Sequence, residues 1–379
     1  MTKLLIITTI QRTLRDFLLP YGDYFRSLGW QVDAMSNIRD PFPVAEEHFD
    51  HFWPVDWGRN PLDLHNFIHT PKKIREIVQR EGYDIVHVHT PVAAFITRFA
   101  LRKMRAAGKV KVIYTAHGFH FYKGNLKIKN SLFIVLEKLA GQWTDHLIVM
   151  NQEDYDSALK YGIAKKDNLT LMPGIGVDLS LYTHNPQIQN QKENIRKEIG
   201  ISSEAVVILI VAEFIPRKRH SDALKTLAIA NNLEYHMVFA GSGPLSEKIK
   251  NEAIHFGLEK QTHFLGHRKD IPRLITAANA LLLISQQEGL PRSIMESMAM
   301  GVPVIGTDIR GTRDLLAENC GMLVPLGDIQ KIAEKIDFVA HPTQELQKII
   351  DNAANKIKKY DIKILLKKHL ELYSRMLRR

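Results

Sequence analysis

Residues 281–296 read Leu-Leu-Leu-Ile-Ser-Gln-Gln-Glu-Gly-Leu-Pro-Arg-Ser-Ile-Met-Glu. The apolar run at the start is typical of a strand that is buried on both faces, and Pro291 is typical of the first turn of a helix. The loop between them carries Glu288, and Glu296 follows inside the predicted helix. A strand, a loop and a helix in this order form one step of a parallel sheet. Two carboxylates around such a turn also offer the acceptor oxygens that a hydroxyl-rich ligand, such as a sugar or a ribose, requires.

The same alternation of apolar runs and amphipathic stretches continues on both sides of this segment. It predicts an α/β protein in which helices cover parallel sheets. Six strands are predicted before a polar gap, at residues 4–8, 31–35, 84–89, 111–116, 146–150 and 170–172. Six more are predicted after it, at residues 206–212, 236–240, 263–265, 280–285, 302–306 and 321–324. Helices fill the spaces between the strands, and Pro20 indicates an irregular start of the first one.

The alternation pauses after Pro173, where a polar segment follows. We place a linker at Gly174–Asn185 and predict two tandem, doubly wound, Rossmann-like domains, residues 1–175 and 176–360. A last amphipathic helix is predicted over about residues 361–379. The chain of 379 residues is long enough for two domains of ~150 residues, each with its own core.

The composition narrows the class of protein. The single cysteine, Cys320, excludes a framework of intramolecular disulfides and is typical of a reducing cytoplasm. The longest apolar runs have only the length of a strand, so no membrane-spanning helix is predicted. The net charge of +10 favours an anionic partner. No helix-turn-helix, RNP or zinc-finger spacing points to nucleic acid as that partner.

Part of the positive charge is concentrated in two clusters. The first cluster consists of Arg98, Arg102, Lys103, Arg105, Lys109 and Lys111. The second consists of Lys123, Lys127 and Lys129 and directly precedes the apolar residues 132–136. Basic residues beside an apolar helical face suit contact with an anionic lipid surface. The alternative is a solvated helix face above an ordinary core stripe.

Residues that suit a ligand follow the predicted strands at their carboxyl ends, where doubly wound sheets bind ligands. Besides the two glutamates, these are the basic loop Ile215–Arg219, the turn Gly241–Pro244 and His117. Three cations in one loop suit a diphosphate, and glycine turns let backbone amides approach a phosphate. Two such edges that face each other would form a cleft between the domains.

Each of these features also has a purely structural reading. An acidic residue such as Glu296 favours the helix dipole wherever it lies in a first turn. The turn Gly241–Pro244 is also an ordinary connection from a strand to a helix, and it does not continue as G-x-G-x-x-G. A lone histidine such as His117 is more often a core residue than a ligand contact.

The sequence offers little support for a metal or for a covalent nucleophile. His87 and His89 share one strand face, but no third ligand follows at a suitable spacing. Asp154-Tyr155-Asp156 follows the N-cap residue Asn151, so we interpret it as a structural helix start. Cys320 has no evident histidine partner.

Residues 288–305 resemble the signature of the retaining glycosyltransferases of family 4, which have the GT-B fold. The two glutamates with seven residues between them, and the following Met-Ala-Met-Gly-Val-Pro-Val at 298–304, match that signature, with Ser297 where alanine is usual. Gly241–Pro244 and Phe264–Arg268 match two further blocks in register, so the resemblance covers essentially the whole chain. Residues 115–121 are similar to a subgroup that builds bacterial exopolysaccharide and capsule.

The resemblance implies a role for each candidate residue. Glu288 would contact hydroxyls of the donor sugar, and Glu296 would contact the ribose. Lys218, helped by Arg217, would hold the donor diphosphate, and His117 would reach the reacting sugar from the amino-terminal domain. The final helix would pack back onto that domain. Further donor contacts are implied for Ser242, Gly243, Gly266, His267, Arg268, Gly289, Leu290 and Pro291.

Two positions depart from the pattern of the family. Many relatives have Gly-Arg where this chain has Ala212-Glu213, so the usual diphosphate arginine is missing. Arg217 and Arg219 are the two candidate replacements. The glycine pair that is common after the first strand is replaced by Thr8-Thr9-Ile10-Gln11.

The resemblance implies a retaining, metal-independent glycosyltransferase of the GT-B fold with an interdomain cleft. It would use a UDP-sugar as substrate, without a cofactor, and transfer a hexose or N-acetylhexosamine to a polyprenyl-diphosphate-linked saccharide. Its place would be the cytoplasm, peripherally on the inner face of a bacterial cell membrane, in the synthesis of surface polysaccharide. Two alternatives remain open, a UDP-sugar epimerase of the same fold and a catalytically inactive partner subunit of another transferase. Glu213 and the missing glycines favour the second of them.

Overall fold

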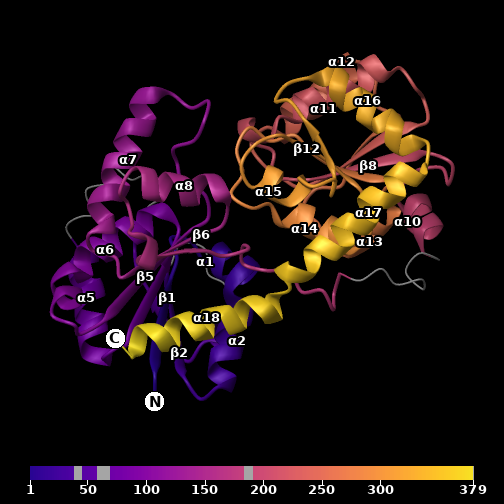
Figure 1. The fold of residues 1–379 in the computed structure, drawn as a ribbon. Helices are drawn as coiled ribbons and strands as arrows, with labels where there is room; N and C mark the ends of the chain where they lie inside the picture. The colour runs from indigo at the N-terminus through magenta and orange to yellow at the C-terminus, as the bar shows by residue number, and fades with distance from the viewer. Residues whose placement is uncertain (38–44, 58–68, 183–190, 379) are drawn as a thin grey trace. The chain divides into compact units, whose positions relative to one another are not determined.

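The computed structural model describes residues 1–37, 45–57, 69–182 and 191–378. These residues form two compact units, each with its own hydrophobic core (Figure 1). Unit 1 comprises Met1–Ile175 and the helix that begins at Ile362, and unit 2 comprises Gly176–Asp361. Residues 183–185 of the predicted linker lie outside the described residues.

Unit 1 contains a parallel sheet of seven strands in the order β3-β2-β1-β4-β5-β6-β7. The strands are β1 (Lys3–Ile7), β2 (Gln31–Ser36), β3 (Phe52–Pro54), β4 (Ile85–His89), β5 (Lys111–Ala116), β6 (His146–Val149) and β7 (Leu169–Leu171). The six strands predicted for this part of the sequence are confirmed to within one residue at each end. The sequence pattern misses β3, which has three residues, ends in a proline and pairs with β2 at the edge of the sheet.

Helices cover both faces of this sheet. The helices of unit 1 are α1 (Gln11–Thr13), α2 (Leu19–Ser27), α3 (Ala45–His48), α5 (Thr70–Glu81), α6 (Pro91–Ala106), α7 (Lys127–Gly141), α8 (Gln152–Lys160) and α18 (Ile362–Leu377), with a π-helical turn at Leu14–Leu18 and a 3-10 turn at Lys166–Asn168. Because side chains alternate along a strand, Leu5 and Ile7 belong to the core cluster that includes buried residues of α5, α6 and α8, whereas Leu4 and Ile6 belong to the cluster on the other face. Pro20 lies in the first turn of α2, directly after the π-helical turn, which confirms the irregular start.

The last helix of the chain packs on unit 1. Leu365 and Tyr373 of α18 are fully buried in the same layer as Phe25 of α2, and the two helices lie side by side (Figure 1). The rings of Phe25 and Tyr373 lie 5.0 Å apart, centroid to centroid. The end of the chain therefore completes the core of the domain that the beginning of the chain forms.

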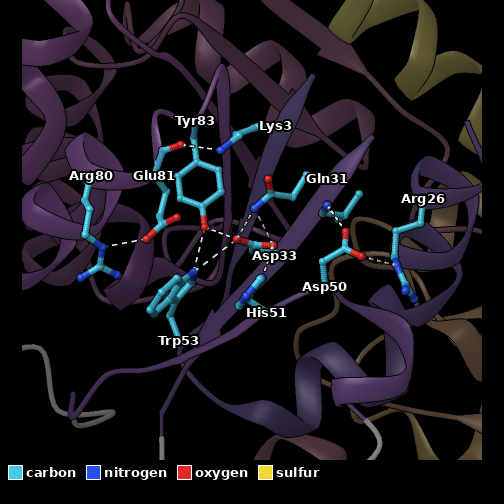
Figure 2. Close-up of polar contacts among 11 residues, drawn as sticks. Lys3, Arg26, Gln31, Asp33, Asp50, His51, Trp53, Arg80, Glu81 and Tyr83 are labelled. Atoms are coloured by element: carbon cyan, nitrogen blue, oxygen red, sulfur yellow. Dashed lines mark hydrogen bonds and ion pairs between the residues drawn. The ribbon is translucent and has the colours of Figure 1, made fainter. Parts of the chain in front are cut away.

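A buried carboxylate links β2, β3 and the segment before β4. Figure 2 shows the side chains that converge on Asp33, which is fully buried. Asp33 accepts hydrogen bonds from the hydroxyl of Tyr83, from Nε1 of Trp53 (3.4 Å) and from Nε2 of Gln31 (3.2 Å), and Nδ1 of His51 lies 3.7 Å away. Burial, reinforced by Asp33, raises the pKa of Tyr83 above its ordinary value. Tyr83 and Gln31 lie at the amino ends of strands, away from the edge where such sheets bind ligands, so we interpret this network as structural.

Unit 2 contains a parallel sheet of six strands in the order β10-β9-β8-β11-β12-β13. The strands are β8 (Val206–Val211), β9 (Tyr235–Ala240), β10 (Thr262–Phe264), β11 (Ala280–Leu283), β12 (Val304–Thr307) and β13 (Met322–Val324). The helices are α10 (Lys192–Glu198), α11 (His220–Ala230), α12 (Ser246–His255), α13 (Ile271–Ala277), α14 (Arg292–Ala299), α15 (Thr312–Leu316), α16 (Ile329–Ala340) and α17 (Gln344–Ile357), with 3-10 turns at Pro216–Lys218 and Lys358–Tyr360. All six predicted strands are confirmed to within two residues at each end.

The strand order of each sheet reverses at one point, where the chain moves from one half of the sheet to the other. In unit 1 this switch point lies between β1 and β4, and in unit 2 it lies between β8 and β11. In doubly wound sheets, ligands bind outside the carboxyl ends of the strands at this point. Within the described part of the chain, no helix has both the length and the apolar character that crossing a membrane requires.

Candidate functional site

Unit 2 brings two candidate residues together across its switch point. Lys218 ends the 3-10 turn after β8, and Glu288 lies in the loop after β11. The Nζ of Lys218 lies 2.5 Å from Oε1 of Glu288, and both side chains are largely buried. Burial strengthens such a pair because less water screens the charges. An ammonium has three hydrogens, so this bond leaves donors for an anion that binds beside Glu288.

The loop that carries Glu288 is held from both sides. On one side, Nη1 of Arg217 donates to the carbonyl of Gln287 (3.1 Å), and the amide of Gln286 donates to the carbonyl of Arg217 (2.8 Å). On the other side, Nε of Arg310 donates to the carbonyl of Glu288 (3.3 Å), and Arg310 is buried. The loops after β8 and β12 therefore position Glu288 before any ligand binds.

A substitution at Gly311, which follows Arg310, tests whether the loop after β12 contacts the loop that carries Glu288. The backbone of Gly311 has φ +74°, and a Cβ would lie 1.9 Å from the carbonyl oxygen of Gly289. Gly82 has φ +68° and ψ +49°, the left-handed helical region, with nothing within 4 Å of its Cβ position, so Gly82→Ala measures the cost of a positive φ without a clash. Gly311 combines its positive φ with ψ −50°, a region that residues with a Cβ avoid, so its strain adds to the clash. We expect Gly311→Ala to cost about 2 kcal/mol more than Gly82→Ala, which lowers the melting temperature by a further ~4–8 °C. Equal losses in thermal unfolding would show that the two loops are not in contact.

The second glutamate is a buried carboxylate with two partners. Nε of Arg292, one turn earlier on α14, lies 2.8 Å from Oε1 of Glu296, and Tyr182 hydrogen-bonds the same side chain. Burial raises the pKa of Glu296, and Arg292 and Tyr182 act in the opposite direction. Because a carboxylate has about four acceptor positions, these two bonds leave capacity for the hydroxyls of a ligand.

The glycine turn after β9 packs directly on the loop after β8. A Cβ on Gly243 would lie 2.6 Å from the carbonyl oxygen of Phe214, whose amide donates to the carbonyl of Ser242 (3.0 Å). The amide of Gly241 in turn donates to the carbonyl of Gly266 after β10 (2.8 Å). A Cβ on Gly241 would lie 1.9 Å from the carbonyl oxygen of Ala212, so the packing of one backbone on another explains both glycines by itself. The same contacts bring Ser242 and Gly243 to the edge that carries Lys218.

The two candidate replacements for the missing arginine differ in their surroundings. The guanidinium of Arg219 pairs with Asp222 in the first turn of α11. The side chain of Arg217 is 43% exposed, and its Nη1 lies 3.8 Å from Oε1 of Glu288. Glu213 is exposed. Arg217 thus lies beside the ion pair, whereas the guanidinium of Arg219 is engaged by Asp222.

The remaining candidate residues of unit 2 differ in their exposure and in whether their side chains already have hydrogen-bond partners. Gly266 and His267 are exposed in the loop after β10. The guanidinium of Arg268 forms two hydrogen bonds with Asp270, at 2.8 and 2.6 Å, so its side chain is engaged within the loop. Gly289–Pro291 leads into α14, with Leu290 partly exposed and Pro291 as the buried N-cap.

At the switch point of unit 1, hydrogen bonds connect the segments that follow β1 and β4. Thr9 follows β1 and Thr90 follows β4. The Oγ1 of Thr90 accepts the amide of Thr9 at 2.9 Å and lies 2.6 Å from Oγ1 of Thr9. Thr90 has φ +66°, which is strained for a β-branched residue. In this chain, hydrogen bonds of the Thr90 side chain therefore hold the loop in which the family pattern has a pair of glycines.

A row of histidines runs from the carboxyl ends of the unit 1 strands to α18; His87 and His89 are buried and His117 is partly buried. The Nε2 of His117, directly after β5, lies 3.0 Å from Nδ1 of His89. His87 lies on the same face of β4, with its ring centroid 4.2 Å from that of His89. The two ring nitrogens of His87 bond with Oγ1 of Thr115 (2.7 Å) and with the hydroxyl of Tyr373 (2.5 Å).

Burial lowers the pKa of each histidine in this row. The pKa of His117 falls to about 4. The pKa values of His87 and His89 lie well below the ordinary value, because burial and the neighbouring histidines both disfavour the charged form. All three rings are therefore neutral at pH 7, and each offers one donor and one acceptor. His117 can contribute a hydrogen bond at neutral pH, but no positive charge.

The loop that begins with His117 is fixed by α8. Oδ1 of Asn151 caps α8 by accepting the amide of Asp154 (2.8 Å). Oδ2 of Asp154, which is fully buried, accepts the amide of Phe119 (3.0 Å). The structural interpretation of Asp154 is thus confirmed. Among the described residues, no group of three histidine, cysteine or acidic side chains is placed to hold a metal ion.

Three side chains of the site, Arg292, Arg310 and Tyr182, are not among the residues predicted from the sequence. Arg292 stands four residues before Glu296, a spacing that suggests an ion pair on any helix. Arg310 lies after β12, so only the general rule about the carboxyl ends of strands points to it. Tyr182 lies in the segment that enters unit 2, and no local pattern predicts that it reaches Glu296.

Known proteins resemble this chain along nearly its whole length. Residues 191–356 match the family described as "Glycosyl transferases group 1", and residues 21–180 match "Glycosyltransferase Family 4". EpsD of Bacillus subtilis (strain 168), named as a glycosyltransferase, is 31% identical over 352 residues, 92% of this chain and 90% of EpsD. The UDP-Gal:alpha-D-GlcNAc-diphosphoundecaprenol alpha-1,3-galactosyltransferase of Escherichia coli is 31% identical over 289 residues, 74% of this chain and 72% of that enzyme.

A solved structure has the same fold. The crystal structure of HepE from Anabaena in complex with UDP and glucose aligns with a TM-score of 0.82 over 99% of this chain and 100% of that chain. The sequence identity is 18%, so this likeness concerns the fold alone.

Proposed function

Because this chain belongs to the family 4 glycosyltransferases, we propose that it transfers a hexose or N-acetylhexosamine from a UDP-sugar to a polyprenyl-diphosphate-linked saccharide. The relatives are bacterial exopolysaccharide and capsule glycosyltransferases, and the name of the Escherichia coli enzyme contains both a UDP-sugar and a lipid diphosphate. We further propose that the reaction retains the anomeric configuration, requires no metal or cofactor, and takes place on the inner face of the cell membrane.

The observation that carries the proposal is the pair of Lys218 and Glu288 across the switch point of unit 2. In a nucleotide sugar, the diphosphate is bonded to the anomeric carbon of the sugar ring, so it lies close to the sugar hydroxyls. A binding site therefore needs a cation for the diphosphate and an acceptor for the hydroxyls side by side. Lys218 and the neighbouring Arg217 supply positive charge for the diphosphate, and Glu288 supplies the acceptor. Glu296 would accept hydrogens from the ribose, with Tyr182 and Arg292 holding its carboxylate in place.

Further contacts with the donor would come from the loops around this pair. Ser242, Gly243 and the backbone amides of Gly289 and Leu290 lie on loops at the same edge of the sheet, where helix starts favour phosphate. Pro291 follows them without an N–H of its own, so it can contribute packing against the donor but no hydrogen bond from its backbone nitrogen. For the base we propose Gly266 and His267, which are exposed, and the backbone of Arg268, whose side chain is engaged by Asp270.

In the reaction that we propose, the bond between the anomeric carbon and the diphosphate oxygen breaks, and its electron pair leaves with UDP. The acceptor hydroxyl forms the new bond on the same face of the sugar, and its proton passes to the leaving phosphate oxygen. Lys218 and Arg217 stabilise the charge that develops on this oxygen, which is why no metal is required. His117, neutral at pH 7, would hydrogen-bond a hydroxyl of the reacting sugar.

The proposal is tested by incubating the full chain with a panel of UDP-sugars, with and without a polyprenyl-diphosphate-linked sugar. Transfer of one sugar to the lipid-linked acceptor is the expected result, with unchanged activity in EDTA and an α-linkage from an α-configured donor in NMR. The matching UDP-sugar should also stabilise the protein by about 2–3 kcal/mol at a concentration of 100 Kd.

Each other outcome points to a different protein. An epimerised UDP-sugar that forms without acceptor would indicate an epimerase. Binding or turnover of none of the UDP-sugars would indicate a partner subunit of another transferase. Loss of activity in EDTA, restored by a divalent ion, would contradict the proposal that no metal takes part.

A further inference from the structure

Helix α7 exposes an unusual amount of apolar surface for a helix of a folded domain. Of its fifteen residues, Ala140 alone is buried. We define the α7 stripe as four large apolar side chains with high exposed fractions, Ile128 (86%), Leu132 (57%), Val135 (62%) and Leu139 (42%). Leu126, directly before the helix, is 65% exposed as well. A contiguous apolar patch of this kind marks a surface that contacts another body.

The α7 stripe is one face of the helix, and the opposite face is occupied. At about 100° per residue, the four residues of the stripe lie within roughly 60° of one another. Phe133 and Ile134 point the other way and pack against the core of unit 1. Glu137 also faces inward, where its Oε2 lies 2.9 Å from Nη2 of the buried Arg98. The stripe is therefore available while the helix remains docked.

Lysines flank the α7 stripe on both sides. Lys129 lies about 100° from Ile128 on one side, and Lys127 and Lys138 lie about 80–100° away on the other. These three side chains and Lys123 in the preceding loop are exposed. The one carboxylate of the helix, that of Glu137, is engaged by Arg98. The exposed side of α7 thus combines apolar and cationic groups without any exposed acid.

The charge at the start of α7 indicates what covers the stripe. The first turn contains no acidic residue and carries Lys127 and Lys129, although the helix dipole favours negative charge at this end. An anionic surface against this end offsets both the dipole and the lysines. A protein partner would have to supply apolar and acidic groups in matching positions, whereas an anionic bilayer offers both without any special arrangement.

The first basic cluster of the sequence does not form a comparable surface. Arg98 is buried, with its guanidinium 4.2 Å from the ring centroid of Tyr114. Nε of Arg105 bonds with Oδ1 of Asp145 at 2.9 Å. Two of the six cations are thus used inside the domain. Of the two clusters, only the lysines around α7 adjoin large exposed apolar side chains among the described residues.

We infer that α7 lies on an anionic bilayer, with the α7 stripe at the boundary of headgroups and acyl chains and Lys123, Lys127, Lys129 and Lys138 among the phosphates. This inference names the membrane contact of the proposed function and rests on it for the lipid-linked acceptor. The loop between His117 and α7 is held at both ends, because Asp154 accepts the amide of Phe119, and Nδ2 of Asn130 donates to the carbonyl of Tyr122 (3.0 Å). Unit 1 therefore keeps His117 in a defined position relative to the membrane surface.

The test measures flotation of the full chain with vesicles, in the absence of any nucleotide sugar. We expect binding to phosphatidylglycerol–phosphatidylcholine vesicles that weakens with salt, and little binding to phosphatidylcholine alone. The variant Leu132→Ser/Val135→Ser and the variant Lys123→Gln/Lys127→Gln/Lys129→Gln should each bind at least ~10-fold more weakly. The matched control is Leu233→Ser/Ile254→Ser in unit 2, where the side chains are 80% and 57% exposed, and it should bind like the wild type.

Several results would overturn the inference. These are absence of wild-type binding at every salt concentration, equal binding by the α7 variants, or self-association of the wild type that the same variants abolish. The transfer reaction is assayed separately with a short-chain, water-dispersed acceptor, on which the α7 variants should keep the wild-type rate. Vesicle binding without transfer would support the membrane contact of α7 and refute the proposed reaction. Transfer without vesicle binding would support the reaction and refute the membrane contact.

Discussion

Lys218→Ala should lower kcat by about a hundredfold to a thousandfold, the effect of removing one preorganised donor from a developing negative charge. The effect is expected to be this large because Lys218 is the cation that bonds Glu288 at 2.5 Å in a largely buried setting. Its loss removes a partner of the diphosphate and also leaves a buried carboxylate without its ammonium. Steady-state kinetics with the UDP-sugar that the panel identifies would measure it.

The matched control for this variant is Arg219→Ala, one residue further along. It removes the same formal charge from the same loop, but its guanidinium is paired with Asp222. Because partly exposed ion pairs contribute little, we expect a change in stability below about 1 kcal/mol and nearly unchanged kcat. A Lys218→Ala enzyme within threefold of the wild type, or an equal loss in both variants, would refute the role of Lys218.

Acid should unfold the protein between pH 6.5 and pH 4, before most carboxylates are protonated. Four buried histidines have lowered pKa values, namely His87, His89 and His369 in unit 1 and His220 in unit 2, and so does the partly buried His117. Burial is the first cause in each case, and the value falls to about 4 for His117, His220 and His369. In this window the unfolded chain binds protons that the folded chain does not, so stability falls as the pH falls.

The expected size of this effect is comparable to the whole stability of a domain. Each histidine contributes a slope of about 1.4 kcal/mol per pH unit within the window. Several of them together reach the order of 10 kcal/mol, against the ~5–15 kcal/mol by which folded proteins are stable. Urea unfolding at several pH values between 7.5 and 4.5 would measure the slope.

Two single substitutions distinguish the contribution of a buried histidine to the pH dependence of stability from that of an exposed one. His369→Phe keeps an aromatic ring against Tyr21 (4.9 Å between centroids) and should reduce the slope by about one proton. His255→Gln removes an exposed histidine and should leave the slope unchanged. A slope that neither variant changes, or stability that is flat from pH 6.5 to 4.5, would contradict the assignment.

The strands could be predicted closely because their signal is local. A run such as Val206 to Val211 is apolar throughout since the strand is buried on both faces, and its length and β-branched residues distinguish it from a helix. The edge strand β3 has no such signal, since it contacts one neighbour and ends in a proline. The apolar residues 132–136 also show the limit of a local reading, because the helix divides them between the core and the exposed face.

The sequence by itself determined the two doubly wound sheets, the loops after β8 and β11, and the residue types that suit a nucleotide sugar. These features depend on periodicity and on motifs within one short segment, where neighbours in sequence are neighbours in space. Only the tertiary structure decided which residues meet. In the tertiary structure Lys218 pairs with Glu288, and Arg217 lies beside them, whereas Arg219 pairs with Asp222. The tertiary structure also joined Tyr182 to Glu296 and turned the α7 stripe outward. These contacts join segments far apart in the chain or depend on packing against the core, and no local pattern records which partner a side chain will find.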